Sequence, residues 1–194
     1  HLEIVDNYFG EDCGALLADA VRNMPHLSEL MLVDLSLGDE GVLPLLEAVK
    51  ECSIRLRVLK LGFNDLTEEA IAKLCELLPI EETLEVLGLE ENSLGSRGAC
   101  MLVKTLEDCC PRLTSLDLRR NQIGPKAAEL VVKVCLRKKS MEYLDLDGNE
   151  ISEEALGTIR KELEKCDKES LLGGLENNDC EYTSESIDEI KEFL

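Results

Sequence analysis

Apolar and polar positions follow a repeating order along this chain of 194 residues. Four stretches share the order L-x-x-L-x-L-x-x-N-x-L, with small changes at the first and last positions. They are LRVLKLGFNDL from Leu56, LEVLGLEENSL from Leu84, LTSLDLRRNQI from Leu113 and MEYLDLDGNEI from Met141. An earlier copy from Leu27 has Leu35 in place of the asparagine, and the opening LEIVDNYF is the tail of another copy. The chain therefore contains six repeats, the first of them incomplete.

Between these stretches the apolar residues change to helical spacing. In residues 96–109, Ala99, Leu102, Val103 and Leu106 fall on one face, and residues 125–138 form a similar segment. The L-x-L part of each repeat alternates like a half-buried strand. A strand, a turn and a helix in units of 28 or 29 residues are typical of the leucine-rich repeat. They predict an α/β solenoid, or horseshoe, with a parallel concave sheet and convex helices.

The two ends of the chain depart from the regular repeat. We assign residues 1–169 to the repeat domain. Residues 170–194 leave the pattern and become acidic, and we interpret them as a cap on the last repeat or as an acidic tail. The first residues read as mid-strand, with no polar cap before them. We therefore expect the chain to be a fragment of a longer array.

The recurring asparagines are predicted to be structural, because each follows a strand and its side-chain amide can bond backbone groups that the turn leaves unpaired. The members of this predicted ladder are Asn7, Asn64, Asn92, Asn121 and Asn149. The second repeat breaks the rule at Leu35 and also carries Pro44 within its expected helix. Since proline cannot donate a helical hydrogen bond, we predict a distorted or shortened helix there, beginning near Val42 or Leu43.

Composition limits the classes of partner. Acidic residues outnumber basic ones 41 to 21, and the net charge of −20 disfavours binding to nucleic acid or anionic lipid. A protein with a basic surface is the partner that such a charge favours. The sequence has no apolar run long enough to cross a bilayer. We also expect the protein to be a monomer. Nine cysteines without a Cys-x-x-Cys pair are typical of reduced thiols in a cytoplasmic protein.

Catalytic chemistry is poorly represented. The two histidines are His1 at the terminus and His26 in the loop before a strand, and neither is placed to form a Cys-His pair or a Ser-His-Asp triad. The paired acids Glu90 and Glu91, or Asp145 and Asp147, are interpreted as solvated surface groups rather than as cation ligands. We expect no metal, no cofactor and no catalytic residue in this chain.

The concave face is the candidate partner surface, because residues that alternate with the buried leucines point to it. The candidate partner-binding residues on this face and its rim are Lys60, Phe63, Glu90, Glu91, Asp117, Arg119, Arg120, Tyr143, Asp145 and Asp147. Glu90, Arg119 and Asp147 fall in register across neighbouring repeats, as do Glu91 and Arg120. We predict ion pairs along these rows, each worth about 0 to 1 kcal/mol, so the arginines remain open to a partner.

The alternation of 28 and 29 residues and the helix openings SLGSRGACMLVKTL and QIGPKAAELVVKV resemble the ribonuclease-inhibitor-like subtype of leucine-rich repeat. The last repeat, YLDLDGNEISEEALGTIRKELEKC, and the following LLGGLENND resemble the end of the repeat domain in Ran GTPase-activating proteins. That resemblance implies stimulation of GTP hydrolysis by the small GTPase Ran in nucleocytoplasmic transport, with this chain as the C-terminal part of the repeat domain. It also implies a cytoplasmic location, extending to the nuclear envelope.

The same resemblance carries no catalytic residue to this chain. Members of the family are thought to act without an arginine finger, and the arginine and asparagine linked to their activity belong to earlier repeats that no position here matches. The alternative is a non-enzymatic binding scaffold, similar to ribonuclease inhibitor or to innate-immune receptors, that grips a basic protein. The absence of Trp disfavours the inhibitor version, since its grip relies on aromatic anchors.

Overall fold

The computed structural model describes residues 1–175, 177–178 and 185–194. Six strands form one sheet in chain order, and each is parallel to the next. The strands are β1 (Leu2–Val5), β2 (Glu29–Val33), β3 (Val58–Lys60), β4 (Val86–Gly88), β5 (Ser115–Asp117) and β6 (Tyr143–Asp145). The α-helices are α1 (Gly14–Arg22), α2 (Gly38–Glu51), α3 (Glu68–Leu77), α4 (Gly95–Asp108), α5 (Pro125–Arg137), α6 (Glu153–Lys165) and α7 (Ile187–Ile190). The 3₁₀ turns are η1 (Glu11–Cys13), η2 (Leu78–Ile80) and η3 (Glu169–Leu171).

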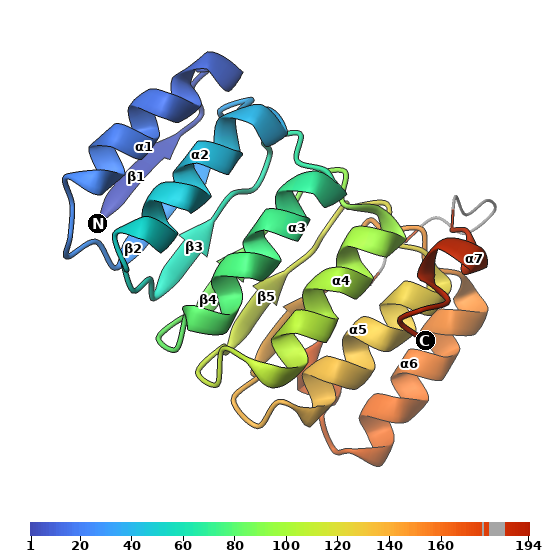
Figure 1. Ribbon diagram of the computed structural model, residues 1–194. Coiled ribbons are helices and arrows are strands. Elements are labelled where there is room, and N and C mark those ends of the chain that lie inside the picture. The colour runs from blue at the N-terminus through green and yellow to red at the C-terminus, as the bar shows by residue number, and fades with distance from the viewer. Residues whose placement is uncertain (176, 179–184) are drawn as a thin grey trace.

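Helices α1 to α6 lie side by side in chain order over one face of the sheet (Figure 1). Each of these six helices follows its own strand, so the order strand, turn, helix recurs in every repeat. This is the predicted α/β solenoid, and no helix of the described residues covers the other face of the sheet (Figure 1). None of the helices in the described part of the chain is long and apolar enough to cross a bilayer.

The core lies between the sheet and the helices and consists mainly of leucine. Leu59, Leu87, Leu116 and Leu144 pair across neighbouring strands, and each is at most 1% exposed. Because each repeat contributes one short strand, its apolar residues are covered by the repeats on either side. The solenoid therefore depends on contacts between neighbouring repeats.

The asparagine ladder is confirmed in the turns after β3, β4, β5 and β6. At Asn149, Oδ1 accepts from the backbone N–H of Asn121 at 2.9 Å and of Ile123 at 3.0 Å. The Asn149 amide nitrogen donates to the carbonyls of Leu118 at 3.0 Å and Leu146 at 2.9 Å. Each side chain thus joins its own turn to the turn of the preceding repeat. Asn7, in contrast, is exposed, and its amide donates to the carbonyl of Val5.

The prediction of a shortened second helix is wrong. Helix α2 begins at Gly38 and has 14 residues, the same length as α4. Pro44 lies within it and cannot donate to the carbonyl of Glu40. Glu40 is on the exposed side of the helix, where water can bond that carbonyl, so one missing hydrogen bond does not end the helix.

The described residues after 169 make several contacts with the repeats. Leu172 forms a parallel bridge with Leu144, and the Asn178 side chain accepts from the N–H of Asn149 at 2.9 Å, which adds one member to the ladder. Further on, Ile190 of α7 is fully buried, and α7 contacts α4. Other parts of the predicted cap or tail, residues 176 and 179–184, lie outside the described residues. The domain division at residue 169 stays a prediction.

Candidate functional site

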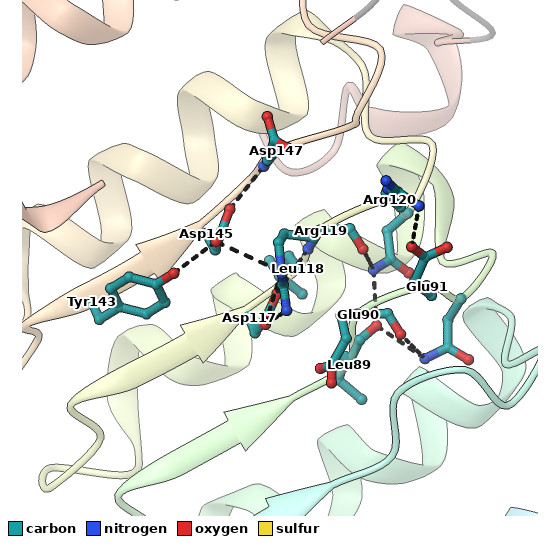
Figure 2. Close-up of polar contacts among 12 residues, drawn as sticks. Leu89, Glu90, Glu91, Asp117, Leu118, Arg119, Arg120, Tyr143, Asp145 and Asp147 are labelled. Carbon is teal, nitrogen blue, oxygen red and sulfur yellow. Dashed lines mark hydrogen bonds and ion pairs between the residues drawn. The ribbon is translucent and has the colours of Figure 1, made fainter. Parts of the chain in front are cut away.

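Nine of the ten candidate residues lie at the carboxyl ends of β3 to β6 or in the turns that follow, and Tyr143 begins β6 with its hydroxyl on Asp145 at the end of that strand. Parallel strands place their carboxyl ends at one edge of the sheet, so residues from different repeats meet there. Figure 2 shows Arg119 and Arg120 between the acidic residues that follow β4 and those of β6. The neighbours of each side chain decide which of them a partner could contact.

Arg119 binds the carboxylate of Asp117 on its own strand. Its Nε lies 3.0 Å from Asp117 Oδ1 and its Nη2 lies 2.7 Å from Oδ2 (Figure 2). Its Nε is also 3.6 Å from Oδ2 of Asp145. The hydrogen bond with Asp117 raises the pKa of Arg119.

The predicted row of Glu90, Arg119 and Asp147 is therefore correct in backbone register but wrong in its ion pairs. Asp117 and Arg119 are two residues apart on one face, where a long arginine side chain can fold back onto the nearer carboxylate. The Asp147 carboxylate instead accepts the backbone N–H of Asn177 at 3.0 Å and its side-chain amide at 2.6 Å. Desolvation raises the pKa of Asp147, but these hydrogen bonds lower it by more, so the net shift is downward.

Asp145 is the most deeply buried acid of the group, at 4% exposure. It accepts the Tyr143 hydroxyl at 2.7 Å and the backbone N–H of Asp147 at 3.0 Å. The bond to Asp145 raises the pKa of Tyr143 to about 12, so the phenol keeps its proton at neutral pH. A side chain at Gly173 would collide here, since its Cβ would lie 2.7 Å from Asp145 Oδ2. The ring of Tyr143 is fixed at its hydroxyl and remains 42% exposed.

Arg120 and Glu91 form the pair that the register predicts, with 2.6 Å between Arg120 Nη1 and Glu91 Oε1. Both residues have positive φ, 50° for Arg120 and 53° for Glu91, as the chain turns out of the strand. The Arg120 side chain passes over Gly148, where a Cβ would lie 2.5 Å from Arg120 Cγ. Arg120 stays 61% exposed and open to a partner.

Glu90 occupies a space left by two glycines. A Cβ on Gly62 would lie 2.5 Å from the Glu90 carboxyl carbon, and one on Gly88 would lie 2.9 Å from its Oε2. That oxygen is buried without a hydrogen-bond partner among the described residues, and desolvation raises the pKa of Glu90. Lys60 and Glu90 border a cavity of about 200 Å³ that Asp117, Arg119 and Tyr143 also line.

Phe63 lies on the rim of the same face. Its N–H donates to the carbonyl of Glu90 at 2.9 Å, its φ is 57°, and its ring is 44% exposed. The structure thus brings two exposed aromatic rings and two arginines to one edge of the sheet, around buried carboxylates. Sequence reasoning missed Gly173 and Asn177, because both follow the last full copy of the repeat. The spacing of 29 residues from Asn149 to Asn178 is the signal that could have extended the repeat to this segment.

This arrangement suits recognition of a protein. Tyrosine and arginine are the residues that most often dominate protein interfaces, and here hydrogen bonds hold both in place. In the described part of the chain, no cluster of three or more His, Cys, Asp and Glu side chains is arranged to hold a metal ion. The arginines of this edge lie beside acids that balance their charge.

Comparison with known proteins identifies similar repeats. The family model described as "Leucine Rich repeat" matches residues 109–132. RAN GTPase-activating protein 2 of Arabidopsis thaliana is 31% identical over 145 residues, which cover 75% of this chain and 26% of that protein. The ribonuclease inhibitor of Mus musculus is 27% identical over 190 residues, which cover 95% of this chain and 41% of the inhibitor. The chain thus spans about a quarter and two-fifths of these two relatives.

Two solved structures have the same fold. The actin-binding site 2 of leiomodin-1 superposes with a TM-score of 0.62 at 17% identity, covering 78% of this chain and 87% of that one. The tropomodulin C-terminal domain of Caenorhabditis elegans gives a TM-score of 0.63 at 16% identity, covering 78% and 93%. At these identities the likeness concerns the fold alone.

Proposed function

Since this chain is a leucine-rich repeat protein that resembles Ran GTPase-activating proteins, we propose that it takes part in activating GTP hydrolysis by Ran. In this proposal the helix-free face of the sheet, at the edge where β3 to β6 end, binds the GTPase. The resemblance supports the activity, and the exposed side chains of that edge support its choice as the binding surface. In this proposal the protein is a monomer that acts in the cytoplasm and at the nuclear envelope.

The observation that carries the proposal is the fixed group of exposed side chains at this edge. Tyr143 is held by Asp145, Arg119 by Asp117 and Arg120 by Glu91. A side chain already held in one position loses little conformational entropy when a partner arrives. The edge therefore offers pre-organised contacts, which is what a protein-binding surface needs.

Charge supports the choice of a protein partner. The chain carries a net charge of −20, so its field attracts a basic surface and repels nucleic acid. Complementary charge raises the rate of association and selects partners more than it adds affinity. We therefore expect binding to weaken and association to slow as salt rises.

The chain's contribution to activation is binding and orientation of the GTPase. An arginine finger must reach freely into a partner's site, where it contributes about 10³ to 10⁵ in rate. Arg119 is held by one carboxylate and lies near a second. It is unsuited to that role, and in this proposal the catalytic groups are those of the GTPase.

The proposal is tested by titrating the chain with Ran loaded with a non-hydrolysable GTP analogue and, separately, with GDP. We expect saturable binding to the GTP-like form and weaker binding to the GDP form. The Arabidopsis relative serves as positive control, both for binding and for acceleration of single-turnover GTP hydrolysis. Equal or undetectable binding to both forms, with the relative active in the same assay, would count against the proposal.

The second candidate is a binding scaffold without GTPase activation, favoured by the match to ribonuclease inhibitor over 95% of this chain. In that case the same edge would grip another basic protein. Titration with a basic pancreatic-type ribonuclease separates the two candidates. Tight binding to the ribonuclease with no binding to Ran would favour the scaffold.

A further inference from the structure

Two thiols come together where α4 ends, away from the edge described above. The Sγ atoms of Cys109 and Cys110 are 3.6 Å apart. Side chains of neighbouring residues point to opposite sides of an extended chain. Here Cys109 is extended, at φ −132° and ψ −177°, but Cys110 turns to a positive φ of 50°. This turn brings both sulfur atoms to the same side.

The same position recurs two repeats earlier and two repeats later, with one thiol instead of two. Cys52 is followed by Ser53, and Cys166 is followed by Asp167. Ser53 and Asp167 also have positive φ, 52° and 53°. The backbone turn is therefore a feature of the repeat, and the second thiol at Cys110 is what sets this copy apart from the other two.

The pair is open to small molecules. Both cysteines line a cavity of about 490 Å³, together with Pro79, Pro111, Lys138 and Ser140. Cys109 is half-buried, whereas Cys110 is 1% exposed. A reagent can thus approach Cys109 first and meet Cys110 behind it.

The surroundings favour a reactive Cys109. The Lys138 ammonium donates to the carbonyl of Cys109 at 2.7 Å, which places a positive charge beside the thiols. The sulfur contact with Cys110 lowers the pKa of Cys109 against the effect of burial, and Lys138 lowers it further. The same contact and burial raise the pKa of Cys110. The two pKa shifts therefore run in opposite directions, and Cys109 is the more acidic thiol of the pair.

A bridging atom suits this pair better than a direct bond between the sulfurs. A disulfide requires about 2.05 Å between sulfurs and usually joins Cα atoms about 4.4 to 6.8 Å apart. Adjacent residues across a trans peptide have Cα atoms only about 3.8 Å apart. A direct disulfide would therefore be strained. One soft atom bonded to both sulfurs can leave them close to their present separation.

We propose that Cys109 and Cys110 form a two-thiol binding site for trivalent arsenicals, the class of soft electrophile that takes two sulfur ligands on one atom. The Cys109 thiolate attacks the arsenic of an arsenoxide, R–As=O, and the Cys110 thiol then displaces the oxygen. Two As–S bonds form, and the oxygen leaves as water with the two thiol protons. Arsenic stays trivalent, so no oxidant or reductant is needed.

The test uses phenylarsine oxide on the reduced chain in the presence of excess monothiol, followed by intact-mass and peptide mass spectrometry. Monothiol adducts exchange with the free monothiol, whereas an adduct on two adjacent sulfurs persists until a dithiol such as 2,3-dimercaptopropanol removes it. We expect one phenylarsenic group per chain, located on the peptide that contains Cys109 and Cys110.

Matched variants decide which sulfurs are used. Cys110→Ser reproduces the natural Cys52–Ser53 pair and should lose the persistent adduct, as should Cys109→Ser. Cys52→Ser and Cys166→Ser should retain it. Thermal melting of each variant checks that the fold is kept, and the half-buried Cys109 decides the matter if Cys110→Ser unfolds.

Three results would overturn the proposal. One is an adduct that survives in a folded Cys109→Ser variant. Another is an adduct that maps to Cys180 or that depends on Cys75 instead of Cys110. The third is the absence of any adduct that resists monothiol in the parent chain.

Discussion

Arg120 and Asn121 are neighbours in one turn, yet their surroundings are opposite. The Arg120 side chain is 61% exposed and meets Glu91 on the helix-free face, whereas Asn121 is fully buried and its amide donates to the carbonyls of Leu89 and Arg119. The turn of each repeat thus has a buried polar side and an open polar side. The buried side holds the repeats together, and the open side can change its contacts at little cost in stability.

Breaking the buried side should have the largest effect. Asn149→Ala removes four hydrogen bonds to backbone groups of two repeats. At about 1 kcal/mol for each bond, we expect the free energy of unfolding to fall by about 4 kcal/mol. Asn7→Ala is the matched control at the exposed end of the ladder and should cost less than about 0.5 kcal/mol. Urea unfolding measures both, and equal losses would contradict the distinction.

The second repeat allows the reverse change, the introduction of an asparagine where the ladder lacks one. Leu35 stands where the ladder has asparagine and is fully buried. The backbone N–H groups that an asparagine side chain at this position would need already bond elsewhere, since Asn7 donates to Asp34 and Phe9 donates to Leu35. We expect Leu35→Asn to cost about 3 kcal/mol, because it buries an unsatisfied amide. Leu35→Met should cost less than about 1.5 kcal/mol. A more stable Leu35→Asn chain would show that the ladder can be extended.

Replacing each of the two arginines of the open side by alanine should lower the free energy of unfolding by slightly different amounts. Arg119→Ala leaves Asp117 and the buried Asp145 without their cation, so we expect a loss of about 1 kcal/mol. Arg120→Ala breaks one exposed pair and should cost less than about 0.5 kcal/mol. Thermal unfolding at low and high salt would detect the difference, which should shrink as salt rises. A loss of several kcal/mol for either variant would place that arginine among the structural residues.

Glu90 should give the smallest effect, and one that depends on pH. Its raised pKa means that the folded chain binds a proton more readily than the unfolded chain, so charged Glu90 destabilises the fold as pH rises through its ordinary pKa of about 4.3 and toward the raised value. We expect Glu90→Gln to raise Tm by about 1 to 2 °C at pH 7. The gain should be smaller at about pH 4, where the parent is partly protonated. An equal gain at both pH values would mean that ionisation is not its cause.

Much of the fold could be predicted because the same sequence pattern recurs in each repeat. The leucines indicated the strands and the core, and the asparagines indicated the ladder. Pro44 misled the prediction because one missing helical bond can be replaced by water at an exposed position. Asn178 was missed because the residues after 169 do not keep the leucine pattern, although its spacing of 29 residues from Asn149 matches the repeat.

The candidate site could be predicted in position but not in its contacts. Strand register placed Arg119 beside Glu90 and Asp147, and it paired Arg120 with Glu91. Register fixes backbone positions, whereas a flexible arginine chooses among several nearby carboxylates. Arg119 pairs with Asp117, two residues away on its own strand. The Asp147 carboxylate accepts hydrogen bonds from Asn177 instead. Such choices depend on side-chain geometry that the repeat pattern does not contain.

The central claim is that the edge where β3 to β6 end binds Ran. The most direct test compares two single-residue variants by their dissociation constants for Ran bound to a non-hydrolysable GTP analogue. Tyr143→Ala removes a fixed, half-exposed ring from this edge, and Tyr8→Ala removes a 90% exposed ring near β1. We predict a Kd about tenfold higher for Tyr143→Ala, equivalent to about 1.4 kcal/mol, and an unchanged Kd for Tyr8→Ala. Equal Kd values for the parent and Tyr143→Ala would contradict the claim.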